Sequence, residues 1–151
     1  MKSALAWCAA LAAALAVSAP ARAPAAVGPG TIRITAVEKL HKIVDRGHRG
    51  IGIGDVEIVR LRLYNPSITP KPIGRGDLVC TFVDTRIRMC DGTYQLPRGK
   101  LVVAGTFASR LLYDLAIVGG TLLYDNARGS LTVTATGFRP RHEVLVFRLT
   151  G

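Results

Sequence analysis

Residues 131–136 read LTVTAT, a clean alternation of apolar and polar side chains. In an extended chain, Leu131, Val133 and Ala135 fall on one face and the intervening threonines fall on the other. A period of two over this length indicates a β-strand with one buried face. Valine and threonine also favour strands, because branched side chains are stiff and suit a pleated surface.

The same character extends outward from this segment through most of the chain. Short stretches rich in aliphatic and β-branched residues alternate with glycine and proline turns, and Asp91-Gly92 is a turn pair that divides one of them. No stretch after the N-terminal apolar run has a convincing helical period, and residues 39–44 are the one candidate, which is short. The expected strands are residues 31–37, 55–64, 78–84, 87–89 with 93–96, 100–107, 115–118, 131–136 and 143–149.

Composition and length agree with one globular domain. The chain has 151 residues, of which 49% are hydrophobic and 20% charged, and these proportions are ordinary for folded proteins. Short strands at regular spacing predict an antiparallel sandwich or barrel. Several strands are apolar on both faces, which predicts an apolar interior and an outer wall covered by a loop or by another subunit.

The N-terminus indicates export. Lys2 precedes the uncharged apolar run of residues 4–17, and small residues and prolines follow. This order is typical of a secretory signal, and the run is shorter than the roughly 20 residues of a membrane-spanning helix. We expect cleavage after Ala25, which leaves residues 26–151 as a secreted, extracellular domain without a membrane anchor. A buried N-terminal helix is the alternative.

The chain is strongly basic, with a formal net charge of +10. Such a charge fits nucleic acid, anionic lipid or an acidic polymer as partner. The densest basic stretch, residues 39–49, has no aromatic residues among its charges, as a surface that stacks nucleic-acid bases would have. A solvated basic loop is therefore the interpretation, with loose attraction to an anionic cell surface as the alternative and no nucleic-acid partner.

Two cysteines, Cys80 and Cys90, follow the predicted signal sequence. In an oxidising compartment an even pair is expected to be bridged, and this spacing fits opposite strands of one hairpin. The short loop gives a stabilisation of about 2–3 kcal/mol. A free Cys80 facing a pocket is the alternative.

Motifs for specific chemistry are scarce. The histidines lack the spacing of metal ligands, and no phosphate-binding loop or nucleophile motif is present. Among the carboxylates, Glu38 and Asp84 differ from the rest because each lies at or just after the end of an apolar strand. Either is a candidate acid or base facing a cavity, and a solvated carboxylate is the alternative for both.

The C-terminal half resembles a known family. Residues 115–121 read LAIVGGT, Tyr124 follows, and residues 126–131 read NARGSL. This run is similar to the signature shared by dirigent proteins and allene oxide cyclases. Two adjacent glycines allow a tight reversal, an aromatic residue packs over it, and a third glycine opens the next strand. The signature residues are Gly119, Gly120, Thr121, Tyr124, Arg128 and Gly129.

The resemblance covers most of the chain after residue 38 and carries several implications. It implies an all-β, eight-stranded antiparallel barrel of the allene oxide cyclase or calycin type, assembled as a dimer or trimer. It also implies a small hydrophobic molecule in the lumen and no cofactor. The cyclases close an unstable epoxide, dirigent proteins guide the coupling of phenoxy radicals, and both work by limiting the conformers of a bound substrate.

The transfer of individual residues from the family is incomplete. Glu38 corresponds to the cyclase glutamate, but Leu40 and Leu61 stand where the cyclases carry asparagines. The acidic and basic residues of dirigent sites have only loose counterparts in Asp84, Asp114 and Arg128. Arg128 is interpreted as structural, pairing with a nearby carboxylate or carbonyl.

Three hypotheses therefore remain from the sequence. The first is a secreted barrel that binds a small hydrophobic ligand, and the second is a cyclase or coupling-guiding enzyme. The third is a structural oligomer of the cell surface. An open apolar lumen would favour the first two, and a lumen filled by side chains would favour the third.

Overall fold

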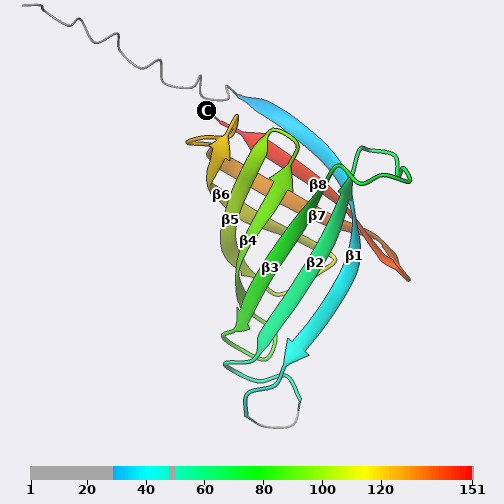
Figure 1. Cartoon of the computed structure of the whole chain (residues 1–151). Coiled ribbons are helices and arrows are strands. Elements are labelled where there is room, and N and C mark those ends of the chain that lie inside the picture. Colours follow the sequence, from blue (N-terminus) through cyan, green and yellow to red (C-terminus); the bar gives the residue numbers. More distant parts are fainter. Residues whose placement is uncertain (1–28, 48–49, 151) are drawn as a thin grey trace, which may run out of the picture.

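A computed structural model describes residues 29–47 and 50–150 of the chain (Figure 1). Every regular element in this part is a β-strand. The predicted signal sequence, residues 1–25, lies outside the described residues and stays a prediction. The strands are β1 (Gly30–Val44), β2 (Val56–Tyr64), β3 (Gly74–Phe82), β4 (Arg88–Leu96), β5 (Gly99–Phe107), β6 (Leu112–Leu122), β7 (Gly129–Phe138) and β8 (Arg141–Leu149).

The strands form a closed barrel. Each strand pairs antiparallel with the next, and β8 returns to pair with β1. The predicted eight-stranded antiparallel barrel is confirmed. We call the end that carries the β2–β3, β4–β5 and β6–β7 connections the upper end, as it lies in Figure 1. The opposite end, where β1 finishes and β2, β4, β6 and β8 begin, is the lower end.

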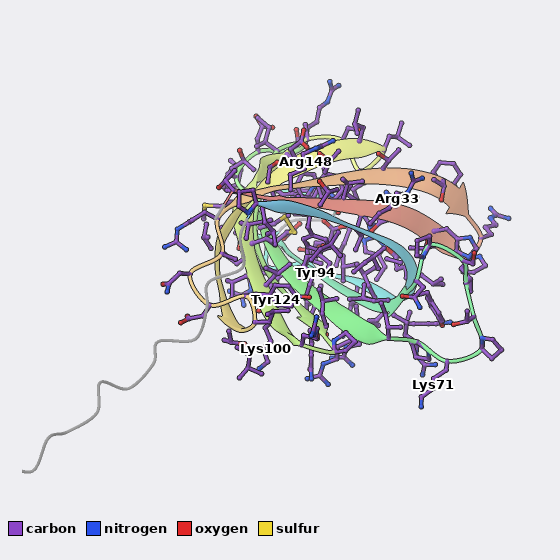
Figure 2. The ribbon with its side chains drawn as sticks, turned by 90° about the horizontal axis from the view of Figure 1, so that it is seen from above. Arg33, Lys71, Tyr94, Lys100, Tyr124 and Arg148 are labelled. Atoms are coloured by element: carbon purple, nitrogen blue, oxygen red, sulfur yellow. A yellow bond between two sulfur atoms is a disulfide. The ribbon has the colours of Figure 1, made fainter. Side chains whose placement is uncertain are left out.

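Apolar side chains fill the upper and middle lumen. Alternate residues of every strand point inward, as the period of two requires, and Figure 2 shows Tyr94 inside the ring of strands. The ring of Tyr94 meets that of Phe147 edge to face, with 5.2 Å between centroids. The largest apolar or aromatic side chains with less than 2% exposure are Tyr94, Phe82, Phe147, Leu61, Leu63, Leu101, Leu131 and Leu145.

The one short candidate for a helix, residues 39–44, forms a strand. β1 continues to Val44, and its lower half pairs with β2 from Leu40 opposite Arg60 to Val44 opposite Val56. A short helix would leave this half of β2 without a partner strand on that side, so the cross-strand hydrogen bonds outweigh a weak local preference.

The predicted turn at Asp91 and Gly92 is wrong, because both lie within β4. Gly92 pairs with Leu78 on β3, and a Cβ at Gly92 would lie 2.8 Å from the Leu78 side chain. The glycine is therefore needed for close packing inside the barrel rather than for a turn. In β7, by contrast, the predicted inward and outward faces agree with the burial of Leu131 and Val133.

The glycine signature works differently from the expectation. Gly119 and Gly120 remain in β6, and the chain reverses later, with positive φ angles at Leu122 and Asn126. Gly120 is required because the carbonyl oxygen of Tyr124 would lie 2.1 Å from any Cβ placed there. Tyr124 is buried as expected, and Gly129 opens β7 with φ of 139°.

Two strand pairs come apart toward the lower end. The pairing of β1 with β8 stops at Val37 opposite His142, so the lower half of β1 pairs with β2 alone. The pairing of β5 with β6 stops at Ala104 opposite Ala116, so the end of β5 pairs with β4 alone. We call these two places the lower seams.

A disulfide joins Cys80 and Cys90, which lie directly opposite each other on β3 and β4. Both cysteines are buried on the inner side of the wall. The predicted bridge is confirmed, and Cys80 is therefore excluded as a free thiol.

Candidate functional site

The lower end of the lumen holds a group of charged side chains. Glu57 and Glu143 are each 1% exposed, which is unusual for carboxylates unless they are paired. Three arginines, a third glutamate and a histidine surround them. We call this group the charged cluster, and its members are Glu38, His41, Glu57, Arg88, Arg110, Arg141 and Glu143.

A β-bulge brings two members of the cluster to the same face of β1. The register shifts between Glu38 and Leu40, so Lys39 is an extra residue opposite β2. Glu38 and His41, three positions apart, therefore both point into the lumen. Leu40 points outward and is 39% exposed, so this leucine does not occupy a position in the site. Leu61 does face the lumen, directly opposite Glu38.

Glu57 on β2 is the most extensively paired carboxylate of the cluster. His41 Nε2 lies 2.7 Å from Oε1, Arg88 donates to Oε2 at 2.7 Å, and Arg110 Nη1 lies 3.4 Å from Oε1. Burial alone would raise the pKa of Glu57. The hydrogen bond from Arg88 and the charges of Arg110 and Arg88 outweigh burial, so the pKa lies below the ordinary value. Glu57 is thus held in its charged form.

Arg110 connects the glutamates. It comes from the β5–β6 connection and reaches over the lower mouth to Glu38, at 2.5 Å, and to Glu57 and Glu143. Although burial alone would lower the pKa of Arg110, the hydrogen bond that it donates to Glu38 and the nearby carboxylate charges raise it. Arg141 donates to the backbone carbonyl of Arg110 and fixes this connection against β8.

Glu143 differs from Glu57 because one of its oxygens is free. Arg141 donates to Oε1 at 2.7 Å, whereas Oε2 is buried and has no hydrogen-bond partner among the described residues. The hydroxyl of Tyr94 is also buried without a partner there. Burial, with Tyr113 and Glu143 nearby, raises the pKa of Tyr94 well above its ordinary value. Native proteins seldom leave such groups unpaired.

Aromatic rings form the wall beside these charges. Phe107 and Tyr113 stack with 3.9 Å between their centroids and 17° between their planes. The Arg88 guanidinium lies over Phe82 and Phe107, at 4.7 Å and 5.3 Å from the ring centroids, where a cation is attracted by the ring face. Burial and the charge of Glu143 raise the pKa of Tyr113, which therefore stays neutral.

The two carboxylates singled out from the sequence have different surroundings. Glu38 belongs to the charged cluster. Asp84 lies in the β3–β4 connection, is exposed, and accepts a hydrogen bond from Thr85, which is the largest of the causes that lower its pKa. A catalytic role for either residue stays a prediction, but the two do not share a site. In the family signature, Arg128 donates to the Ala127 carbonyl at 2.9 Å.

Sequence reasoning missed Glu57, Glu143 and the three arginines. The sequence did carry one signal for the two glutamates. Glu57 is two residues from the inward Val59 and four from Leu61, and Glu143 is two residues from the inward Leu145, so each falls on the inner face of its strand. A carboxylate in phase with the apolar residues of a strand points into the barrel. The arginines had no such signal, because their ion pairs cross between distant strands.

Four hollows of about 160–610 Å³ lie along the wall and the upper mouth, and no residue of the charged cluster lines any of them. The described residues contain no group of three or more histidine, cysteine, aspartate or glutamate side chains placed to hold a metal ion. They also contain no helix long and apolar enough to cross a membrane.

Comparisons by sequence give no family. No protein-family model matches the chain, and no curated protein is significantly similar to it.

Comparisons by structure give related barrels. Pyocyanin demethylase matches with a TM-score of 0.70 and 25% identity, covering 80% of this chain and 100% of that one. A pterocarpan synthase dirigent protein matches with a TM-score of 0.59 and 17% identity, covering 82% and 97%. The Diels–Alderase of Streptomyces koyangensis matches with a TM-score of 0.61 and 15% identity, covering 78% of this chain and 64% of that one. The chain therefore shares the barrel fold of dirigent proteins and cyclases, while its resemblance to allene oxide cyclases in particular stays a prediction.

Proposed function

We propose that this barrel binds a small, largely apolar molecule with an aromatic ring at the lower end of its lumen and converts it by proton transfer at Glu143. The observation that carries the proposal is the free, buried Oε2 of Glu143, which lies in an otherwise paired cluster beside aromatic walls. A carboxylate that keeps one unpaired oxygen away from water is suited to accept a proton or a hydrogen bond from a ligand.

The other charged residues position the ligand and stabilise charge in the site, and they do not transfer protons. Both oxygens of Glu57 are occupied by Arg88, Arg110 and His41. Its low pKa makes it a poor acid, so it supplies a fixed negative charge. Fixed charges and dipoles in a site shielded from water stabilise charge that develops during a reaction without having to reorganise. The proposed chemistry uses side chains alone, in keeping with the expectation of no cofactor.

Access requires the β5–β6 connection to move. Arg110 covers the cluster from that connection, and the adjacent lower seam leaves the end of β5 without hydrogen bonds to β6. Displacement of Arg110 would open the lumen between Glu38 and Glu143. Such loop motions commonly admit substrate and then exclude water.

The comparisons support a small-molecule role. Pyocyanin demethylase is named for its action on pyocyanin, and the similarity extends over that whole chain. The dirigent protein and the Diels–Alderase are likewise named for synthetic activities. We further propose that the protein is secreted, because a buried disulfide suits an oxidising compartment.

A tryptophan reporter tests the binding site with pyocyanin as the probe. Trp7, the only tryptophan, lies in the predicted signal sequence, and residues 26–151 contain all eight strands. In this chain, Phe107→Trp places a fluorophore beside the cluster. Phe138→Trp, at an exposed position on β7, is the control. We expect pyocyanin to quench the Phe107→Trp reporter saturably and to leave the Phe138→Trp control unquenched. Equal quenching of both would contradict a luminal site.

Turnover tests the role of Glu143. Loss of pyocyanin absorbance is expected to slow by about 100-fold in Glu143→Gln, with quenching of the Phe107→Trp reporter retained. Asp91→Asn is the matched control, since Asp91 is exposed on β4 and lies outside the cluster, and its rate should equal that of the parent. A Glu143→Gln variant that converts pyocyanin at the parent rate would remove Glu143 from the mechanism.

A structural role is the second candidate, favoured by the filled upper and middle lumen. Large exposed apolar side chains on β6, among them Leu112 at 60% and Leu122 at 73%, could be covered by a second copy in a homodimer or trimer. In that case the charged cluster would fix strand register. The two reporters would then respond alike to pyocyanin, and light scattering would show an oligomer.

A further inference from the structure

The upper end of the barrel carries a second feature, which is independent of the charged cluster. A hollow of about 610 Å³ lies between the β2–β3 and β4–β5 connections, with Arg62 and Arg75 on its lining. A smaller hollow of about 210 Å³ opens at the upper mouth. The two share Ile73, Leu96 and Pro97 as lining residues, so they adjoin, and we call the pair the upper groove. The larger hollow alone falls in the range of roughly 300–1,000 Å³ that small-molecule sites occupy.

The larger hollow has a cationic wall. Arg62 on β2 and Arg75 on β3 lie directly opposite each other in the ladder. Like charges in this position destabilise a strand pair. Arg75 has Asp77 at 3.5 Å, but Asp77 is also bound by Arg60 at 2.9 Å. Arg62 forms no ion pair with any described residue. An anion between Arg62 and Arg75 would relieve their repulsion.

The smaller hollow is largely apolar. Ile32 and Ile34 on β1, Ile73 and Leu96 line it, and Tyr124 forms part of its wall. Arg33 and Arg98 also line it. A ligand that spans both hollows would thus place an apolar segment here and a charged group beside Arg62.

The charge around this end is mostly positive. Figure 2 shows Lys71 and Lys100 projecting away from the barrel. The acidic residues near this end are Asp125, in the β6–β7 connection, and Asp77 on β3, which pairs with Arg60 and Arg75. The basic residues there are Arg33, Arg62, Lys71, Arg75, Arg98, Lys100, Arg128 and Arg148. The charged cluster pairs three glutamates with three arginines, so it does not account for the excess positive charge of the chain.

We infer that this groove binds a free, single-chain amphiphile with an anionic head group. The head, a phosphate or carboxylate, lies between Arg62 and Arg75, because guanidinium groups bind such oxyanions through paired hydrogen bonds. The apolar chain follows the shared residues Ile73 and Leu96 to the hollow beside Tyr124. The site and the proposed conversion at Glu143 lie at opposite ends of the barrel.

Calorimetric titration of residues 26–151 with dodecyl phosphate, below its micelle concentration, tests the inference. Arg62→Gln is expected to weaken binding by about tenfold or more, as the loss of a charged hydrogen bond does. Arg148→Gln is the matched control, since it removes one charge from the same end but lines neither hollow. It should weaken binding by less than about twofold. Equal losses in the two variants, or no binding by the parent, would overturn the inference.

Three further probes separate head from chain. Inorganic phosphate and butyl phosphate should bind at least about tenfold more weakly than dodecyl phosphate, since they lack the apolar segment. Uncharged dodecyl maltoside should not compete. Equal affinity for butyl and dodecyl phosphate would show that the ligand does not use the apolar hollow. Competition by the maltoside would show that the ligand does not need the arginines. Dodecanoate in place of dodecyl phosphate then ranks carboxylate against phosphate as the head.

Discussion

Glu57 illustrates how a single residue can be costly in isolation and stable in context. A carboxylate at 1% exposure loses its hydration, yet Arg88, Arg110 and His41 occupy both of its oxygens. Removing one partner from such a group leaves a buried charge uncompensated, which costs about 3–5 kcal/mol. The cluster therefore depends on completeness more than on any one pair.

The pH dependence of stability should report Glu57 directly. Its pKa in the folded chain lies below the ordinary value of 4.5, so the unfolded chain takes up the proton first. The stabilisation is complete above pH 4.5 and is lost as the pH falls from there through the folded pKa. Glu57→Gln should lower the free energy of unfolding at pH 7 and flatten its fall in acid. Urea denaturation from pH 3 to 7 checks this, and parallel curves for the two proteins would contradict it.

Replacing Tyr94 should change the free energy of unfolding in the opposite direction to replacing Glu57. Its hydroxyl is buried without a partner among the described residues, so Tyr94→Phe is expected to raise the free energy of unfolding by about 1 kcal/mol. Because the pKa of Tyr94 is raised in the folded chain, the stability linked to its protonated hydroxyl is present below about pH 10 and is lost above it. The Tyr94→Phe variant should therefore resist alkali better. Tyr64→Phe, at a buried tyrosine without an orphaned hydroxyl, is the control for thermal unfolding. A less stable Tyr94→Phe would mean that the hydroxyl has a bound partner.

Residue-level prediction from the sequence succeeded where local context was sufficient. Cys80 and Cys90 were paired correctly, because a hairpin spacing limits where their side chains can go. Glu38 was singled out and does lie in the cluster, although its role is untested. Glu57 and Glu143 were missed, because recognising them requires the strand register, which depends on partners far along the chain.

At the scale of elements, β1 shows what sequence patterns cannot reveal. Its lower half, residues 39–44, is the one short candidate for a helix but forms a strand because β2 offers hydrogen-bond partners. The bulge at Lys39 then decides which side chains enter the lumen. In sequence, Leu40 stands where the cyclases carry an asparagine, whereas the bulge turns Leu40 outward and brings His41 into the lumen. In β7, where the alternation is unbroken through Ala135, the sequence alone was sufficient.

Deleting Lys39 tests the bulge. With Lys39 absent, Leu40 alone separates Glu38 from His41, so the ladder becomes regular and both still point inward. The deletion should therefore fold and keep the contact between His41 and Glu57, at a cost of about 1–2 kcal/mol for altered strand curvature. Deleting Arg60, directly across in a regular strand, should prevent folding, because it turns Glu57 and Val59 outward. Denaturation midpoints distinguish the two, and equal destabilisation would contradict the assignment of the bulge.

At the scale of the molecule, the barrel holds the charged cluster at its lower end and the basic groove at its upper end. Regular spacing and glycine turns were enough to predict about eight strands in an antiparallel sandwich or barrel. The choice of the closed barrel came from the resemblance to dirigent proteins and cyclases. The functional ends could not be predicted, since the cluster draws on β1, β2, β4, β8 and the β5–β6 connection. Packed side chains around Tyr94 and Phe147 lie between the two ends. The export signal and the oligomeric state stay predictions.

The lower seams have a consequence for hydrogen exchange. Where β1 runs past its last pairing with β8, and where β5 runs past its last pairing with β6, every second amide faces no partner strand. These amides, in residues 39–44 and 105–107, should exchange with deuterium far sooner than those of β3, which is paired on both sides throughout. Mass-resolved exchange would then mark the flexible rim of the barrel beside the charged cluster. A ligand bound under Arg110 should slow exchange at both seams at once, while a ligand at the upper groove should leave them unchanged.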